Sequence, residues 1–232
     1  MQSDKIDNIV NTHLKPIHDK LKQFQPKYEL LREIPEQIMA CTNINPDDCV
    51  LELGGSIGRN SCVINSILKN KSHHLVIEPS INEARKLKNN RDNNNLGFLI
   101  EESAISDVPL YSKGWYTFTT QINGSVKVNT ISYNDIISKY NLNFNVLVID
   151  NEGNFVSMLK SFPNILDGIR LLIIEHDFNS MDDLNYFYKI MKSNNYEISS
   201  TYLKKDKYGP GNNWSDGVVG DNIFVSVWSK IL

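Results

Sequence analysis

Hydrophobic positions near the start of the chain recur at three- and four-residue spacing, which predicts helices over residues 4–41. The apolar positions of the first helical stretch are Ile6, Ile9, Val10, Leu14 and Ile17, and those of the second are Leu30, Leu31, Ile34, Ile38 and Met39. Pro26 separates the two stretches, Pro16 is expected to bend the first, and residues 43–46 form a break. We therefore expect residues 1–45 to be a helical extension that packs on, and covers, a domain formed by residues 46–232.

From Cys49 onward, short uninterrupted apolar runs alternate with helical segments. Strands are predicted at residues 49–53, 74–77, 98–100, 145–150 and 169–175, and helices at residues 61–69, 81–90, 155–161 and 182–193. Apolar runs of this kind are typical of parallel strands that are covered on both faces. The alternation therefore predicts an α/β fold with a doubly wound, mostly parallel sheet.

Two regions depart from this alternation. Residues 115–120 and 126–130 are predicted as additional strands around a turn at Asn123-Gly124. Residues 196–203 and 223–228 are predicted as a terminal hairpin, because no helix separates them and the segment between them is rich in glycine and asparagine. Such a hairpin would place the last strand antiparallel within the sheet.

Charge and cysteine content narrow the possible partners and the location. The 232 residues include 24 Lys and Arg against 27 Asp and Glu, a net charge of −3, so a partner held mainly by phosphate neutralisation is not expected. The apolar runs are too short to cross a bilayer, and the first residues do not form a secretory signal. Cys41, Cys49 and Cys62 form no C-x-x-C pair, which predicts three reduced thiols and a cytoplasmic location.

A glycine-rich turn follows the first predicted core strand. It reads Leu51-Glu-Leu-Gly-Gly-Ser-Ile-Gly58, and Glu78 follows at the end of the second strand, where a carboxylate can accept both hydroxyl hydrogens of a ribose. Glycines let a ligand approach the backbone, and the next helix points its first N–H groups toward that ligand. The residues expected to contact the cofactor are Glu52, Gly54, Gly55, Ser56, Gly58, Glu78, Pro79 beneath the ribose, and Ser103 and Ala104 beside the adenine ring.

Two cofactor classes use such a turn. A dinucleotide fingerprint needs glycines at positions i, i+2 and i+5, and aligning Gly55 and Gly58 with the last two puts Leu53 at the first. The observed order is acidic-x-Gly-Gly-x-x-Gly, and the acidic residue suits a cationic nucleoside such as S-adenosylmethionine better than a pyrophosphate. The plain alternative is a strand-to-helix turn that binds no ligand.

Six segments, at residues 50–58, 77–79, 103–107, 130–137, 147–153 and 173–176, follow one another in the order and spacing of a known family. On these motifs the sequence resembles the FkbM-type methyltransferases over about residues 49–228. The resemblance implies a seven-stranded class I methyltransferase sheet, S-adenosylmethionine as methyl donor, and O-methylation of a sugar or another small hydroxylated acceptor. Glu52 stands where this family commonly has Asp, and Val148 where it often has Lys, which puts a catalytic lysine at that position in doubt.

Polar residues that follow the 145–150 and 169–175 strands are candidates for catalysis. A sugar hydroxyl is a poor nucleophile, so a base or a metal ion should take or share its proton. Asp150, Glu152 and His176 are the candidate catalytic residues, and an imidazole can take up a proton near neutral pH. In the second mechanism Asp150 with Glu175 or Asp177 binds Mg²⁺ or Mn²⁺. Both mechanisms stay open, as do a hydrogen-bonding role for His176 and a helix-capping role for Glu152.

Trp214 and Asp216, before the last strand, are candidate acceptor-binding residues. An aromatic side chain can stack on a sugar ring while a carboxylate binds its hydroxyls, although packing under a long loop is the alternative. The leading hypothesis is an S-adenosylmethionine-dependent O-methyltransferase for a glycan or its precursor. The alternatives are a methyltransferase for another small molecule or a nucleic acid, and a catalytically idle binding module.

Overall fold

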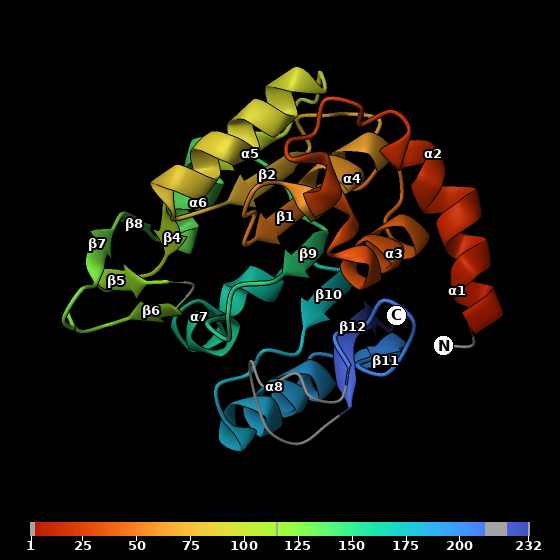
Figure 1. The fold of residues 1–232 in the computed structure, drawn as a ribbon. Helices are drawn as coiled ribbons and strands as arrows, with labels where there is room; N and C mark the ends of the chain where they lie inside the picture. Colours follow the sequence, from red (N-terminus) through yellow and green to blue (C-terminus); the bar gives the residue numbers. More distant parts are fainter. Residues whose placement is uncertain (1–2, 115, 212–221, 232) are drawn as a thin grey trace.

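A seven-stranded sheet forms the centre of this computed structural model, which describes residues 3–114, 116–211 and 222–231 (Figure 1). Across the sheet the strands are β11 (Tyr196–Leu203), β12 (Ile223–Lys230), β10 (Leu171–Glu175), β9 (Val146–Ile149), β1 (Val50–Leu53), β2 (His74–Ile77) and β3 (Leu99–Glu101). Strands β10, β9, β1, β2 and β3 pair in parallel, whereas β12 is antiparallel to both β10 and β11. The predicted doubly wound, mostly parallel sheet with an antiparallel last strand is confirmed.

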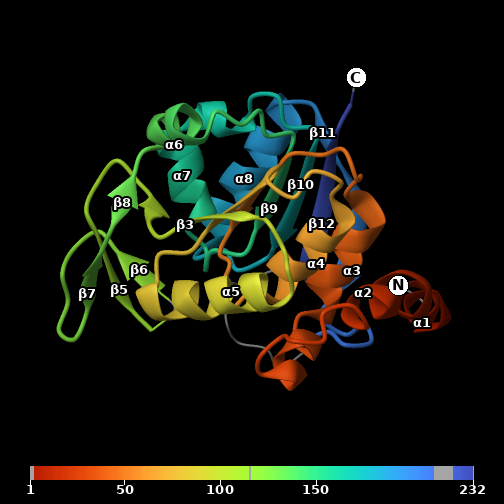
Figure 2. The same ribbon diagram turned by 90° about the horizontal axis from the view of Figure 1, so that it is seen from above.

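Helices cover both faces of this sheet, as Figure 2 shows. Helices α3 (Ile34–Asn43), α4 (Arg59–Ile67) and α5 (Ile81–Asn93) lie on one face, and α6 (Tyr133–Tyr140), α7 (Phe155–Ser161) and α8 (Met181–Ser193) lie on the other. Alternate residues of β1 point to opposite faces, so Val50 belongs to the core under α3 and α4 while Leu51 and Leu53 belong to the core under α7 and α8. Both faces of the sheet are buried under helices, which is why the sequences of these strands are uninterrupted apolar runs.

The N-terminal segment is helical, as its periodicity predicts. It consists of α1 (Ser3–Ile9), a π-helical turn (Val10–Leu14), α2 (Lys15–His18), a 3₁₀ turn (Lys27–Leu31) and α3. Pro16 lies in the first turn of α2, where the missing N–H is tolerated. Ile6, Leu14 and Phe24 are fully buried in the same core as Val50, so this segment packs on the sheet. The division into two domains at residue 45 stays a prediction.

A small antiparallel sheet extends from the core and is only partly predicted by the sequence. Its strands, in the order β6 (Tyr116–Phe118), β5 (Leu110–Lys113) and β7 (Val126–Val128), include the two additional strands expected around Asn123-Gly124. These two strands do not pair with each other, because both pair with β5, which the hydrophobic pattern did not indicate. Two short strands, β4 (Ala104–Ile105) and β8 (Thr130–Ile131), pair in parallel beside it.

The cysteines and the helix lengths agree with the expectations from composition. Cys41, Cys49 and Cys62 are free thiols, and burial raises the pKa of Cys49 to about 11, so this group remains protonated at neutral pH. Within the described ranges, no helix is both long and apolar enough to span a bilayer. The cytoplasmic location stays a prediction.

Candidate functional site

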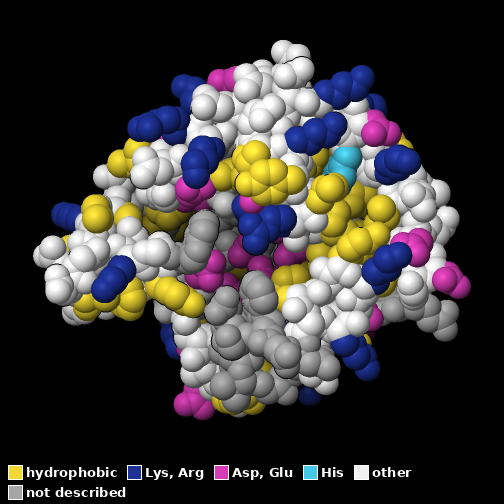
Figure 3. Space-filling model, in the orientation of Figure 1, with side chains coloured by type: hydrophobic (Ala, Val, Ile, Leu, Met, Phe, Trp, Pro, Cys, Tyr) yellow, Lys and Arg dark blue, Asp and Glu magenta, His cyan; other side chains and the backbone are white. Residues whose placement is uncertain are grey.

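A pocket of about 1100 Å³ opens where β1, β2, β9 and β10 end. Gly54, Glu78, Asp150 and Glu175 lie at or just after the carboxyl ends of these four strands, and all four line the pocket. β1 pairs with both β2 and β9, and the helices that follow β1 and β9 lie on opposite faces. The pocket therefore lies at the topological switch point, where open α/β sheets bind their ligands. Figure 3 shows Asp and Glu side chains gathered in this hollow.

The glycine turn after β1 comes into direct contact with the chain after β9. A Cβ atom added at Gly54 would lie 1.6 Å from the carbonyl oxygen of Asp150, and Gly54 has a φ of +92°. Only glycine fits a position with both this backbone angle and this close approach. Ser56, which also has a positive φ of 44°, lines the pocket next to Gly54.

The other two glycines of the turn are packing positions. A Cβ atom at Gly55 would lie 2.3 Å from the Val76 side chain, and one at Gly58 would lie 2.8 Å from the Leu87 side chain. Gly58 is the N-cap residue of α4 and has a φ of +94°. Neither glycine is among the residues that line the pocket. Because they have no side chain, the turn can pack directly against Val76 of β2 and Leu87 of α5.

Glu52 is also predicted to contact the cofactor, but it lies beneath the pocket surface. Its side chain is 2 % exposed, and its Oε2 atom is 2.9 Å from Nε2 of His74, which is fully buried. The two residues stand on the neighbouring strands β1 and β2, and Glu52 does not line the pocket. A buried carboxylate needs such a partner. The geometry therefore gives Glu52 a structural contact with His74.

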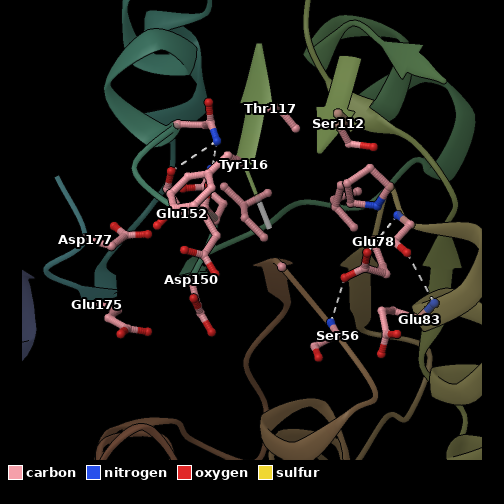
Figure 4. Close-up of a pocket in the computed structure, with 18 of the residues that line it drawn as sticks. Ser56, Glu78, Glu83, Ser112, Tyr116, Thr117, Asp150, Glu152, Glu175 and Asp177 are labelled. Carbon is pink, nitrogen blue, oxygen red and sulfur yellow. Dashed lines mark hydrogen bonds between the residues drawn. The ribbon is translucent and has the colours of Figure 1, made fainter. Parts of the chain in front are cut away.

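Glu78 lies at the end of β2 with its carboxylate held by two backbone groups (Figure 4). The Ser56 N–H donates to its Oε2 atom at 2.7 Å, and the Ser80 N–H donates to its Oε1 atom at 2.8 Å. Burial raises the pKa of Glu78 to about 7, and these two hydrogen bonds oppose that rise. Each carboxylate oxygen keeps a further lone pair for a ligand. This geometry can accept the two hydroxyl hydrogens of a ribose.

The wall beyond Glu78 is largely apolar. It contains Pro79, Ala104, Ile105, Leu110 and Val128, which are all lining residues. An apolar wall next to a ribose acceptor suits an adenine ring. Ser103, predicted to lie beside that ring, does not line the pocket. Its hydroxyl donates to the Glu101 carboxylate, which also accepts from Lys139 Nζ at 2.6 Å and Tyr140 Oη at 2.9 Å.

The opposite part of the pocket is acidic. Six carboxyl groups line it, namely Glu33, Glu36, Asp150, Glu152, Glu175 and Asp177. Burial raises the pKa of Asp150 well above its usual value, and the neighbouring charges, led by that of Glu33, raise it further. Burial likewise raises the pKa of Glu36 to about 8 and that of Asp177 to about 7. A positively charged ligand would oppose these rises by favouring the ionised carboxylates, so the acidic lining suits a cation.

The expected Mg²⁺ or Mn²⁺ site at Asp150, Glu175 and Asp177 is not supported by the arrangement of these groups. Over the described parts of the chain, no three His, Cys, Asp or Glu side chains are grouped as a metal ion requires. Burial and the neighbouring Asp150 raise the pKa of Glu175, which also forms a hydrogen bond with Asp150. Asp177 Oδ2 accepts from the Gly153 N–H at 2.6 Å. Asp150 and Glu175 therefore contact each other, whereas Asp177 is held by the backbone.

His176 is buried and is not one of the lining residues. Its Nε2 atom lies 2.7 Å from the Ser226 hydroxyl, which also accepts from Trp228 Nε1 at 2.8 Å. The ring packs edge-on against Phe178, with the ring centroids 5.3 Å apart. The His176 ring therefore lies beneath the pocket surface, next to Ser226 and Phe178.

Arg59 and the acidic residues of the N-terminal segment were missed by the sequence analysis. Arg59 follows the glycine turn and donates to the Glu29 carboxylate, to Glu33 Oε1 at 2.7 Å and to the Ser56 hydroxyl at 3.3 Å. Glu36 stands two residues from both Ile34 and Ile38, opposite the apolar face of the predicted helix, so the hydrophobic pattern carries no signal for it. The N-terminal segment is thus part of the pocket wall in addition to covering the core.

The far rim of the pocket comes from regions without a predicted role. Ser112 lines it from β5, Gly114 from the turn after β5, Tyr116 and Thr117 from β6, and Phe224 from β12. The candidate acceptor-binding residues Trp214 and Asp216 lie outside the described residues.

Comparison with known proteins finds a similar methyltransferase, although no protein-family profile matches the sequence. The chain is 25% identical over 140 residues to the hexuronic acid methyltransferase AglP of Haloferax volcanii, a match that covers 56% of each protein. It therefore spans just over half the length of that curated relative.

Solved structures show what kind of fold this is. A Klebsiella pneumoniae protein proposed to be an O-methyltransferase superposes with a TM-score of 0.57 at 11% identity, covering 99% of this chain and 97% of that one. An rRNA methylase from Streptococcus thermophilus superposes with a TM-score of 0.52 at 7% identity, covering 87% of this chain and 97% of that one. The fold is that of a class I methyltransferase. At such low identity these structures inform the fold alone, and the chemistry must come from the residues of the pocket.

Proposed function

We propose that this protein is an S-adenosylmethionine-dependent O-methyltransferase of the FkbM type, which methylates a hydroxyl group of a sugar or a related small acceptor. The observation that carries the proposal is the Glu78 carboxylate at the end of β2. It is fixed by the Ser56 and Ser80 N–H groups beside a glycine turn on the neighbouring strand. The sequence similarity to a hexuronic acid methyltransferase supports a sugar as the acceptor class.

The residues of the pocket fit S-adenosylmethionine. Glu78 would accept the ribose hydroxyls, Pro79 and Ala104 would lie along the adenine ring, and Gly54 would let the cofactor approach the backbone. The carboxyl groups beyond Gly54 would stabilise the positive charges of the sulfonium and amino groups. When bound, the cofactor supplies an electrophilic methyl group.

The task of the protein is then to position the acceptor hydroxyl and to accept its proton. Asp150 is the assigned base, because its carboxyl group lies in the pocket between the donor residues and the β10 end. A positive charge in the pocket lowers the pKa of Asp150 and favours its ionised, basic form. His176 is a poorer candidate since its ring is buried against Ser226 and Phe178. Glu152 lines the same wall and is assigned to orient the acceptor.

Calorimetric titration with S-adenosylhomocysteine and S-adenosylmethionine tests the donor site. Glu78→Gln should weaken binding by about 10- to 100-fold, because a hydrogen bond to a charged group contributes about 1.5–3 kcal/mol. Glu52→Gln is the matched control: it makes the same change one strand away, at a residue that faces His74, and should alter affinity less than about threefold. Absence of heat with both nucleosides would overturn the proposal.

A screen of free sugars, nucleotide sugars and glycans for methyl acceptance, read by mass, tests the reaction. Transfer to at least one hydroxylated acceptor is expected, and it should be lost in Asp150→Asn. Donor binding without transfer to any acceptor would instead favour an idle binding module.

A further inference from the structure

The donor in the proposed function carries a negative charge as well as positive ones. S-adenosylmethionine ends in an amino-acid group whose carboxylate is ionised at neutral pH. A carboxylate that leaves water for a pocket needs N–H donors, and a cationic donor forms the stronger hydrogen bonds with it. The residues assigned to the donor, which are Gly54, Glu78, Pro79 and Ala104, carry no positive charge. The donor carboxylate therefore needs a further partner in the pocket wall.

Cationic side chains are scarce in this wall. Arg32 and Arg59 are the only Lys, Arg or His side chains among the lining residues that the structure describes. The residues outside the described ranges contain no Lys, Arg or His. Figure 3 shows Lys or Arg atoms at the edge of the acidic hollow. A cationic partner for the carboxylate must therefore be one of these two arginines.

Arg59 is already committed to protein groups. Its Nε and Nη2 atoms donate to the Glu29 carboxylate. Its Nη1 atom donates to Glu33 Oε1 at 2.7 Å and to the Ser56 hydroxyl at 3.3 Å. The side chain is only 14% exposed. Because all three nitrogen atoms of this guanidinium already donate, Arg59 holds the glycine turn and is poorly placed to bind a ligand.

Arg32, in contrast, has N–H groups to spare. Its Nη1 atom donates to Glu29 Oε1 at 3.1 Å, and its side chain forms no other hydrogen bond within the described ranges. The side chain lines the pocket and is 67% exposed. A guanidinium can bind a carboxylate through two parallel N–H groups, which fixes the orientation of the carboxylate as well as its position.

Hydrogen bonds connect Arg32 to the part of the pocket that would bind the ribose. Arg32 and Arg59 share the Glu29 carboxylate. Arg59 also reaches the Ser56 hydroxyl, and the Ser56 N–H donates to Glu78. Arg32 thus lies on the wall that the N-terminal segment forms beside the glycine turn. Since Arg59 already neutralises Glu29, Arg32 can turn to a ligand without leaving that carboxylate unpaired.

We propose that Arg32 binds the carboxylate of the amino-acid group of the donor. The inference rests on the proposed function and adds a binding residue, from the N-terminal segment, to the same site. Arg32 would then favour nucleosides that keep this carboxylate over those that lack it, because only the former can pair with the guanidinium.

Two nucleosides that differ in this one group test the proposal by calorimetric titration. They are S-adenosylhomocysteine and its decarboxylated analogue, which keeps the adenine, the ribose, the sulfur and the amino group. Arg32→Gln should weaken the binding of S-adenosylhomocysteine by about tenfold, because it removes a charge-assisted hydrogen bond. The same substitution should not weaken the binding of the decarboxylated analogue, which has no group for Arg32 to hold.

Arg85→Gln is the matched control. Arg85 is an exposed residue of α5 that does not line the pocket, so its substitution should change neither affinity by more than about twofold. Equal losses with both nucleosides in Arg32→Gln would show that Arg32 acts only on the structure of the wall, and would overturn the proposal. An unchanged affinity for S-adenosylhomocysteine in this variant would overturn it as well.

The parent protein separates this inference from the proposed function. A parent that binds S-adenosylhomocysteine, beside an Arg32→Gln variant that binds it equally well, refutes only the role of Arg32. A parent that binds neither S-adenosylhomocysteine nor S-adenosylmethionine refutes the proposed function and this inference with it.

Discussion

Gly54 and Asp150 are in direct contact across the β1–β9 pair, because the backbone of the glycine passes beside the carbonyl oxygen of the aspartate. Gly54→Ala would put a Cβ atom 1.6 Å from that oxygen at a φ of +92°. We expect a loss of about 3 kcal/mol in the free energy of unfolding, from overpacking and left-handed strain together, measured by urea denaturation.

Gly114→Ala separates the two causes. Gly114 also has a positive φ, +62°, but an added Cβ atom would have no heavy atom within 4 Å. This variant should lose only the strain contribution, about 1–2 kcal/mol. Equal losses in the two variants would contradict a close contact between the turn and β9.

Arg59 connects the N-terminal segment to the glycine turn, and its removal should destabilise the fold. Its side chain is 14% exposed, and the Glu29 and Glu33 side chains that it pairs with are 11% and 22% exposed. Arg59→Met would leave two poorly solvated carboxylates, at an expected cost of about 3 kcal/mol in urea denaturation. Lys69→Met is the control, since Lys69 and Asp47 form an exposed pair at 2.9 Å that contributes at most about 1 kcal/mol. A similar small loss in both variants would argue against this connection.

Buried carboxyl groups predict that the ligand-free protein is less stable in alkaline than in neutral solution. Burial raises the pKa of Glu36 to about 8 and that of Glu78 to about 7, whereas in the unfolded chain both groups titrate near pH 4.3. Between these values the folded state holds protons that the unfolded chain has released, so the free energy of unfolding falls as pH rises. The Tm should therefore decrease from pH 6 to pH 9.

Glu36→Gln identifies the source of this dependence. The variant should unfold at a higher temperature than the parent at pH 9 and show a flatter pH profile, because it removes the ionisation of a buried group. Glu102→Gln, at an exposed position, should leave the profile unchanged. A Tm that stays constant or rises from pH 6 to pH 9 in the parent would show that these groups do not carry raised pKa values.

The sheet was predictable because its strands carry a local signal. The runs at 74–77 and 196–203 and the helix at 155–161 match the structure residue for residue. β5 was missed because Leu110 to Lys113 are half-buried or exposed and gain their pairing from two segments that follow later in the chain. α6 did have a local signal: Ser132 is an N-cap residue whose hydroxyl accepts from the Asp135 N–H at 3.1 Å.

The strand ends predicted where the pocket lies, but they did not predict which residues form its wall. Parallel strands bring their carboxyl ends to one edge, so Gly54, Glu78 and Asp150 could be expected to lie together. The contribution of Glu36 depends on how the N-terminal helices dock, which no local pattern encodes. The contact between Glu52 and His74 depends on the register of β1 and β2. This register pairs Glu52 with Val76, so His74 is the diagonal neighbour of Glu52, two residues before Val76.

Asp150 and His176 can be distinguished as the catalytic base by parallel substitutions. Asp150→Asn should reduce kcat by about 10²- to 10⁴-fold, because the acceptor proton loses its base, while the affinity for S-adenosylhomocysteine should change less than about threefold. His176→Gln keeps a polar group near Ser226 and should keep kcat within about tenfold, because the ring does not line the pocket. Steady-state assays with the best acceptor from the screen, together with calorimetry, measure both quantities. An active Asp150→Asn variant beside an inactive, folded His176→Gln variant would transfer the role of base to His176 and require the pocket to rearrange when ligands bind.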